Sequence, residues 1–487
     1  MNSSSLKTGS LQSFWWQLLG FATLLLGLLH IVVALFQYVF GYTPFAPYER
    51  WFGLILLIIA VISLPISVFF SSDFRQKCKI LFKKLCSYEQ IFLLILFLWF
   101  AIGCFILQQK EGLPYLKAAD WLLFDTGISV LILFPLARFL GREKASSLIY
   151  FILHLVLISY SLFTAWALWH VFRFSEPVLP SGNFLGMSSR SQLYLGTYYN
   201  MTGAIACMML SLSLYMIISQ KLFWKILYGV FFLLHLVVLM LSDSRTAFLG
   251  GLFLIVCSAF CFSWYCLGKN KKFTTVHNVL FGLVAASLCG VLFWNLRSVI
   301  TSGYTAFSQA RNISASALSS AYPAFLSAGH AKFQTVPLAR EIVPDLNGRT
   351  DIWRAALKVI TSSPLTFFIG VSPVGLTEAL VKIGGISEQF YSTHNVFLDV
   401  AVKFGVPVAL GFLVFTVKIA LRCLSVLFHM KGEDFKTFFM IPLIIITLFV
   451  LNLTEGYLIA YYCIPSCIFF LLCGWLSVFD YKSNRSP

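Results

Sequence analysis

The sequence predicts an all-α protein that crosses a membrane about twelve times. Of its 487 residues, 59% are hydrophobic and only 11% are charged, a balance that a soluble domain of this length does not need. Apolar runs of roughly 20 residues, long enough to span a hydrocarbon core, recur from one end of the chain to the other. Clusters of Lys and Arg occupy alternate connectors between these runs, which indicates how the chain is oriented in the membrane.

Nine predicted membrane helices precede a long polar segment, and three follow it. The nine are expected at residues 14–40, 51–71, 89–108, 119–139, 147–172, 197–219, 222–242, 245–268 and 276–296. The last three are expected at 394–421, 437–456 and 458–478. The chain therefore divides into helices 1–9 (1–296), a polar segment (297–393), and helices 10–12 with a tail (394–487). The first run lacks a convincing small-residue cleavage site, so it is expected to stay as a mature helix.

The basic clusters place both chain termini in the cytoplasm and residues 297–393 outside it. The connector after the second helix contains Arg75, Lys77, Lys79, Lys83 and Lys84, whereas the connector before it contains Arg50 alone. By the positive-inside rule, this alternation predicts a multi-pass protein of the plasma or inner membrane. The net charge of +16 is then explained by topology and attraction to anionic membrane lipids. Nucleic acid is excluded as a partner, because there is no soluble basic domain.

The polar segment 297–393 is long for a connector and is expected to contain interfacial helices. An amphipathic helix is predicted at 347–363, ended by Pro364 and suited to lie at the headgroup level. Its apolar face is expected to consist of Ile352, Trp353, Ala356, Leu357 and Ile360. A weaker interfacial helix is expected within 303–333. The segment contains no cysteine, and no Cys/His spacing in the chain resembles a zinc site.

A tight outward turn reads Ser242-Asp243-Ser244-Arg245. Ser242 or Asp243 is expected to cap the helix that begins near Arg245, so that the positive end of this helix faces outward. Arg245 adds a planar guanidinium that suits phosphate oxygens. The turn is therefore a candidate phosphate site.

His394 ends the polar segment and opens the next hydrophobic helix. Ionisable groups at such a depth are costly and usually serve a purpose. Another outward segment, 173–199, carries Arg190 shortly before Asn200. Three cationic or titratable groups from distant parts of the chain, Arg245, Arg349 and His394, are thus predicted at one membrane interface.

These segments resemble the signature of the O-antigen ligase and polymerase superfamily. The resemblance lies within about 190–410 and rests on the order and spacing of the motifs. They are Arg245 after Ser-Asp-Ser, Gly348-Arg349 with Trp353 and Pro364, and His394-Asn395 with Leu398 and Gly405. The stretch from Arg190 to Asn200 is similar to a Gly-Thr-aromatic-Asn segment of the family. One departure is that no Gly-x-Gly follows Pro364, where the chain reads Leu365 to Gly370.

The resemblance implies a GT-C-like membrane glycosyltransferase. Its donor would be a glycan on polyprenyl diphosphate, such as undecaprenyl diphosphate. Its acceptor would be a hydroxyl on a lipid- or wall-anchored glycan, lipopolysaccharide included, on the extracytoplasmic side. Arg245 and Arg349 would stabilise the leaving diphosphate, and His394 would act as base for the attacking hydroxyl. The substrate-binding residues would be Arg190, Asn200, Asn395 and Trp353.

The implied transfer is inverting and needs neither metal nor cofactor, because two arginines neutralise the diphosphate. Metal-dependent GT-C enzymes typically present an acidic pair in the first outer connector, whereas Gly41 to Arg50 has only Glu49. Whether the enzyme would be a ligase or a polymerase stays open, because the two share donor chemistry and differ in the acceptor.

Less specific interpretations of the same residues stay open. His394 could be a headgroup residue, Arg245 a snorkelling anchor, and Arg349 one more charge on a solvated helix face. Asp399 and Lys403 lie four apart and could simply pair, and Glu455 is interpreted as a turn residue.

The rival class is a lipid-linked oligosaccharide flippase or another multi-spanning transporter. A topology of twelve helices with both termini in the cytoplasm is also typical of such carriers. Only the second half of the chain has a large loop, however, so the two halves do not mirror each other as carrier repeats do.

Overall fold

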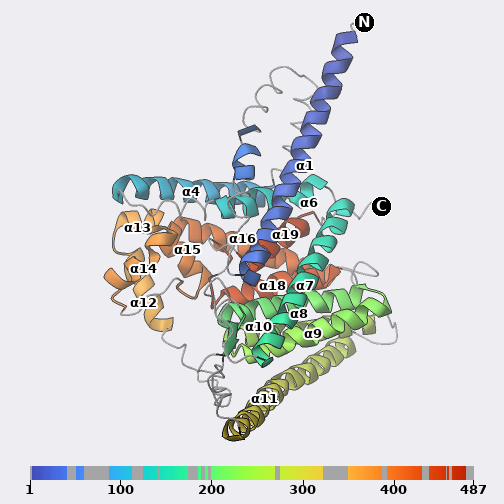
Figure 1. The fold of residues 1–487 in the computed structure, drawn as a ribbon. Helices are drawn as coiled ribbons and strands as arrows, with labels where there is room; N and C mark the ends of the chain where they lie inside the picture. Colours follow the sequence, from blue (N-terminus) through green and yellow to red (C-terminus); the bar gives the residue numbers. More distant parts are fainter. Residues whose placement is uncertain are drawn as a thin grey trace.

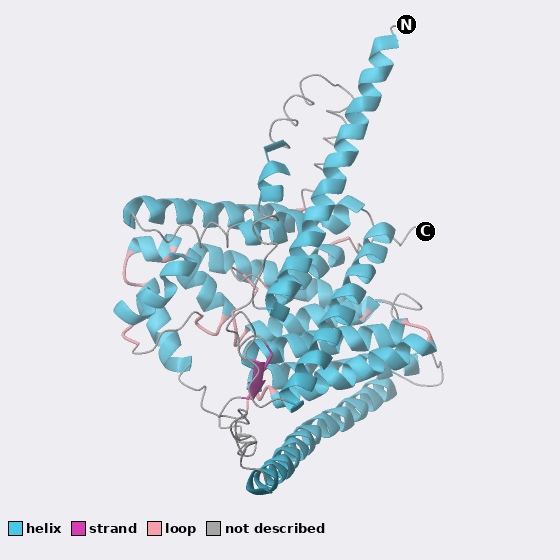
Figure 2. Ribbon diagram, in the orientation of Figure 1, coloured by secondary structure: helices cyan, strands magenta, loops and turns pink. Residues whose placement is uncertain are grey.

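The protein is described by a computed structural model that covers most of the chain. It describes all residues except 1–2, 41–50, 57, 60–86, 112–123, 141, 174–184, 188–191, 196–198, 269–274, 322–348, 387–391, 430–437, 457, 460–462 and 479–487. Over the described residues the fold is a bundle of helices with one short antiparallel hairpin, β1 (Leu185–Met187) and β2 (Leu193–Leu195) (Figures 1 and 2).

Eight described helices are long and apolar enough to cross a membrane. They are α1 (Ser3–Phe40), α4 (Tyr88–Glu111), α7 (Arg142–Arg173), α8 (Tyr199–Ser219), α9 (Leu222–Leu241), α10 (Arg245–Gly268), α11 (Thr275–Ala321) and α16 (Val406–His429). Two shorter apolar helices are α18 (Met440–Asn452) and α19 (Ile464–Leu476). The all-α polytopic class is therefore confirmed. The count of twelve is not, since the helices expected at 51–71 and 119–139 extend beyond the described residues.

The described part also contains shorter helices. Among them are α6 (Phe134–Leu140), entered through the π-helical turn Ser129–Leu133, then α12 (Arg349–Ile360), α13 (Pro364–Ile369), α14 (Ser372–Lys382) and α15 (Val396–Phe404). In Figure 1, α12, α13 and α14 lie together beside α15 at the left, and α11 extends along α10 at the lower border of the molecule.

Two expected helix boundaries are wrong. Helix α11 runs without a break from Thr275 to Ala321, so 276–296 and 303–321 are parts of one helix, and the boundary set at 296/297 falls inside it. No proline interrupts the chain before Pro323, which explains its length. The helix expected at 394–421 is instead broken at Gly405, between α15 and α16.

The break at Gly405 lets two backbone segments pack closely. Gly405 has φ +90 and Gly370 has φ +82, conformations that residues with a side chain rarely adopt. A Cβ at Gly405 would collide with the Phe368 carbonyl, and one at Gly370 would collide with the Lys403 carbonyl. The Val371 amide donates to the Val402 carbonyl at 2.8 Å, so the end of α13 is fastened to the end of α15.

Helix α12 packs its apolar face against α14 and α15. Its buried residues are Ile352, Ala355, Ala356, Val359 and Ile360. The predicted face was therefore partly wrong, because Leu357 is 53% exposed and Trp353 is only partly buried. The helical period of 3.6 residues was predicted correctly. The buried face is rotated about the helix axis relative to the predicted face, because α12 packs against α14 and α15. Pro364 does not end α12 directly: it opens α13, which Ser363 caps.

Candidate active site

His394 lies in a sharply bent turn at the start of α15. Its φ is +54, in the left-handed region that few residues with a side chain adopt. Its backbone N–H donates to the Ser392 hydroxyl at 3.0 Å. Asn395 then caps α15, its side-chain oxygen accepting the N–H groups of Phe397 and Leu398. Such strained backbone is held by its surroundings and is often found at functional sites.

A buried ion pair supports this turn from within α15. The Asp399 carboxylate accepts the Thr393 N–H at 2.7 Å through one oxygen and the Lys403 ammonium at 2.5 Å through the other. Asp399 and Lys403 are 2% and 3% exposed, so each charge depends on the other. From α12, the Trp353 indole N–H donates to the Thr393 carbonyl at 3.0 Å. The turn is thus fixed on two sides.

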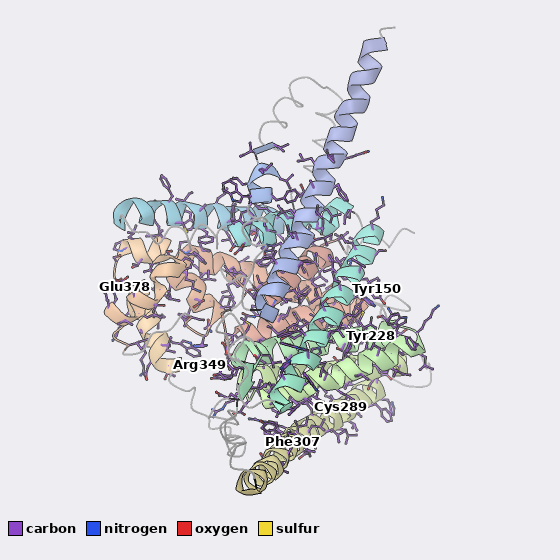
Figure 3. All side chains as sticks on the ribbon, viewed as in Figure 1. Tyr150, Tyr228, Cys289, Phe307, Arg349 and Glu378 are labelled. Atoms are coloured by element: carbon purple, nitrogen blue, oxygen red, sulfur yellow. The ribbon has the colours of Figure 1, made fainter. Side chains whose placement is uncertain are left out.

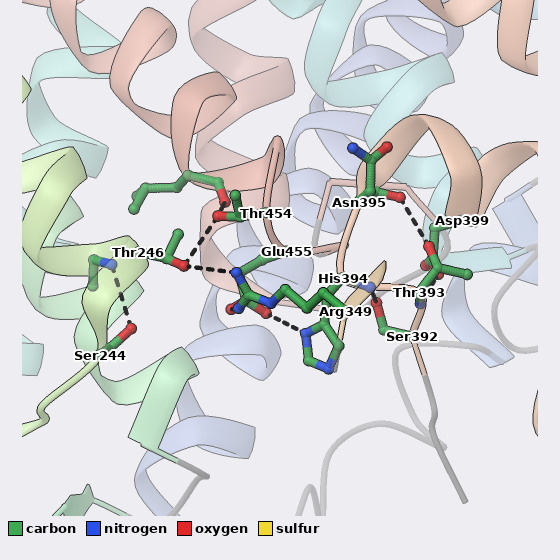
Figure 4. Close-up of polar contacts among 12 residues, drawn as sticks. Ser244, Thr246, Arg349, Ser392, Thr393, His394, Asn395, Asp399, Thr454 and Glu455 are labelled. Carbon is green, nitrogen blue, oxygen red and sulfur yellow. Dashed lines mark hydrogen bonds and ion pairs between the residues drawn. The ribbon is translucent and has the colours of Figure 1, made fainter. Parts of the chain in front are cut away.

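Glu455 joins His394 to Arg349 (Figure 4). One oxygen of its carboxylate lies 2.9 Å from Arg349 Nη2, and the other lies 3.0 Å from His394 Nδ1. The side chain of Glu455 is 1% exposed, whereas those of Arg349 and His394 are 17% and 21% exposed. A buried carboxylate therefore aligns an arginine and a histidine that both reach the surface. Figure 3 shows Arg349 at the end of α12 nearest α10.

The start of α10 lies against the same cluster. The Thr246 hydroxyl accepts a hydrogen bond from Arg349 Nη1 at 3.4 Å and another from the Thr454 hydroxyl at 3.0 Å. Arg245, the residue before Thr246, is the first residue of α10 and is partly buried. Ser244, and not Ser242 or Asp243 as expected, caps this helix, its hydroxyl accepting the Ala247 N–H at 3.3 Å. The cap of α10 therefore lies one or two residues later than expected.

The structure places the predicted site residues in different positions and contacts. Arg349 and His394 meet through Glu455, and Arg245 precedes Thr246, the residue of α10 that contacts Arg349. Trp353 and Asn395, expected to bind substrate, use polar groups to fix the His394 turn, and Asn395 also donates to the Leu453 carbonyl at 3.0 Å. Asn200 is buried in the first turn of α8, and Arg190 lies outside the described residues.

Glu455 was interpreted only as a turn residue, although the sequence carried a signal for it. It is an acidic residue directly after the very apolar helix α18, on the same predicted side of the membrane as His394. An ionisable residue at the end of a membrane helix is a candidate site residue for the same physical reason as His394. Their separation of 61 positions in the sequence concealed the pairing.

Gly456 lets the Glu455 segment approach the His394 turn. A Cβ at Gly456 would lie 2.7 Å from both the Asp399 carboxylate and the Ser392 hydroxyl, closer than atoms tolerate. Gly456→Ala should therefore displace the groups that hold His394 and lower activity by about tenfold or more, since small misplacements are costly in catalysis. The control is Gly229→Ala in α9, where no atom lies within 4 Å. Equal activities of the two purified variants would contradict this role.

The fold and these contacts define a polytopic membrane protein whose polar site gathers where several helices begin or end. A family model described as O-Antigen ligase matches residues 230–413, which contain Arg245, Arg349, Trp353, His394 and Asn395. The match confirms the predicted resemblance and supports the O-antigen ligase and polymerase superfamily. No curated protein matches the chain. The domain supports a membrane enzyme of the ligase or polymerase type.

Proposed function

We propose that the protein transfers a glycan from a polyprenyl-diphosphate carrier to an acceptor hydroxyl on the extracytoplasmic side of the membrane. The observation that carries this proposal is the Arg349–Glu455–His394 bridge beside the start of α10. Arg349 and His394 meet there from two helix ends, and Arg245 begins the helix whose Thr246 contacts Arg349. We infer that these three residues supply the two kinds of group that such a transfer needs. The family domain adds the class of donor, a lipid-linked glycan.

His394 is proposed as the base. Its Nδ1 faces the Glu455 carboxylate, so the neutral ring carries its proton on Nδ1 and its lone pair on Nε2. Nε2 takes the proton of the acceptor hydroxyl while the hydroxyl oxygen attacks the anomeric carbon. The bond between that carbon and the phosphate oxygen breaks, and its electron pair leaves with the diphosphate. The single displacement inverts the anomeric centre.

Arg245 and Arg349 are proposed to bind the leaving diphosphate. The leaving group gains negative charge in the transition state, and fixed cations that face it lower the barrier. Glu455 offsets one of these charges but also holds Arg349 in one orientation, so the arginine loses little freedom when the donor binds. Arg245, Arg349 and Glu455 together leave a net charge of about +1 for the donor.

Charge neutralisation by arginine is the basis for proposing that no divalent metal takes part. Among the described residues, no three His, Cys, Asp or Glu side chains come together as metal ligands. Transfer should accordingly proceed at an unchanged rate in excess EDTA. A rate that collapses in chelator and returns with magnesium would contradict the metal-free proposal.

Arg245→Lys and Arg349→Lys should each lose most activity although the charge is kept. A diphosphate oxygen pair is gripped by the planar guanidinium fork, which lysine lacks. Arg349→Lys should lose more, because its fork also holds Glu455 at 2.9 Å. The measurement is glycan transfer from a purified polyprenyl-diphosphate donor in proteoliposomes, with the exposed Arg354→Lys as control. Normal rates in both site variants would make the two arginines interfacial anchors only.

The site is proposed to face the outside of the cell, with both termini in the cytoplasm. Single cysteines at Thr350 and at Arg354, in a background without the native cysteines, should react with an impermeant thiol reagent in intact cells. Labelling that appears only after lysis would contradict this orientation and the mechanism with it.

A further inference from the structure

The buried pair of Asp399 and Lys403 is not explained by the stability of α15 alone. Both side chains lie almost wholly out of contact with solvent. Taking two charges out of water is expensive, and apolar side chains of similar volume often stabilise a protein equally well in place of such a pair. The contacts of Asp399 show what an apolar residue at this position could not supply.

The carboxylate of Asp399 holds the backbone directly before His394 (Figure 4). One oxygen accepts the Thr393 N–H at 2.7 Å, and the other accepts the Lys403 ammonium. Thr393 is fully buried, so this N–H depends on a protein acceptor rather than on solvent. The Thr393 carbonyl accepts the indole N–H of Trp353. Side chains therefore hold both peptide groups that flank Thr393, and they set the direction in which the chain enters the His394 turn.

The same carboxylate lies against the segment that carries Glu455. A Cβ at Gly456 would lie 2.7 Å from Asp399 Oδ2 and 2.7 Å from the Ser392 hydroxyl, so the Gly456 backbone packs directly on these two groups. Glu455, the residue before Gly456, lies 3.0 Å from His394 Nδ1. Asp399 thus adjoins both the backbone that leads to the histidine and the segment that carries the histidine's partner.

Helix α15 provides a rigid support for these contacts. Asn395 caps its first turn, and the Val402 carbonyl near its end accepts the Val371 N–H at 2.8 Å. Asp399 lies between these two fixed ends, and Lys403, four residues later on the same face, restrains its carboxylate. A group that projects from a restrained helix is positioned more precisely than a group on a loop.

We propose that Asp399 is a positioning residue for the transfer reaction, whose carboxylate oxygen sets the place of the His394 ring relative to Glu455. This inference rests on the proposed function, and it assigns Asp399 no contact with donor or acceptor. The property that matters is a hydrogen-bond acceptor for the Thr393 N–H. Lys403 serves to hold that acceptor in place and to neutralise its charge.

Two double variants separate the acceptor from the charge. Asp399→Asn with Lys403→Gln removes both charges, keeps an oxygen for the Thr393 N–H, and lets the two amides pair across one helical turn. Its transfer rate should stay within about threefold of the wild type, because the acceptor is retained. Asp399→Leu with Lys403→Met also removes both charges but supplies no acceptor. Its rate per folded molecule should fall by at least about tenfold, since small misplacements of a catalytic group are costly.

Single-turnover transfer is measured with the full-length protein in proteoliposomes, and thermal unfolding gives the folded fraction. Binding of undecaprenyl diphosphate is measured in parallel. It should persist in both double variants, because Asp399 does not contact the donor. The matched control is Glu378→Leu with Lys382→Met, which removes another pair four residues apart, on α14, whose side chains are 46% and 72% exposed. This control should transfer at the wild-type rate.

Equal transfer by the two folded Asp399 double variants, whether normal or lost, would overturn the proposal, because the acceptor oxygen would then make no difference. If the Leu/Met variant does not fold, Asp399→Ser with Lys403→Gln replaces it. Serine is polar, but its oxygen lies one bond nearer the backbone than the carboxylate oxygens. Wild-type protein that binds the donor and transfers nothing would instead overturn the proposed function, and this inference with it.

Discussion

His394→Ala and His394→Asn are expected to abolish glycan transfer while donor binding persists. Loss of the base alone lowers the rate by roughly 10²–10⁴, and a less well-held acceptor lowers it further. Two variants are needed because His394 has φ +54. Alanine strains that backbone, whereas asparagine adopts it readily. The asparagine variant should therefore keep the unfolding temperature of the wild type and still be inactive.

The measurement is single-turnover transfer in proteoliposomes, alongside binding of undecaprenyl diphosphate. The control is His277→Ala, an exposed histidine in the first turn of α11. Full activity in a folded His394→Asn protein would remove the imidazole from the chemistry. Loss of donor binding together with activity would instead assign His394 to the diphosphate.

Glu455→Gln is expected to lower the transfer rate by about 10² or more, because a carboxylate that orients a catalytic histidine strongly affects the rate. The amide keeps the shape of the side chain but has one acceptor oxygen. It can satisfy Arg349 or the N–H of His394 Nδ1, and its NH2 group then faces the other donor. Removing the buried charge also destabilises the protein, by less than the roughly 3–5 kcal/mol of fully buried pairs, because Arg349 and His394 reach the surface.

Stability and catalysis are separated by measuring both in one variant set. Thermal unfolding reports the lost ion pair, and the rate per folded molecule reports the misdirected histidine. Glu378→Gln is the control, since Glu378 on α14 (Figure 3) pairs with Lys382 in an ion pair whose side chains are 46% and 72% exposed. A Glu455→Gln protein that unfolds earlier but transfers at the normal rate would limit Glu455 to a structural role.

Local sequence patterns and single unusual residues were enough to predict part of the fold and part of the candidate site. Apolar runs of membrane length identify spanning helices, because the bilayer sets their length. Arg349 and His394 stand out because charged residues at a membrane edge are rare and costly. Ordinary helical periodicity also predicted α12, although not which side of it would face α15.

The rest depends on contacts between distant segments, which no local pattern encodes. Glu455 pairs with His394 only because the end of α18 meets the start of α15. Arg297 looked like a loop residue because its neighbours end an apolar run, while in fact α11 continues for 24 residues beyond it. The break at Gly405 follows from backbone packing against α13, and a glycine alone did not predict it.

The central claim is that this cluster transfers a glycan from a polyprenyl diphosphate. The most direct measurement incubates purified protein in proteoliposomes with the lipid-linked glycans and envelope acceptors extracted from cells that lack the gene. Release of polyprenyl diphosphate and glycosylated acceptor are followed together in EDTA. We predict that the wild type forms the two products in equal amounts and that His394→Asn forms neither. Movement of intact donor across the bilayer without product, or equal transfer by both proteins, would contradict the account.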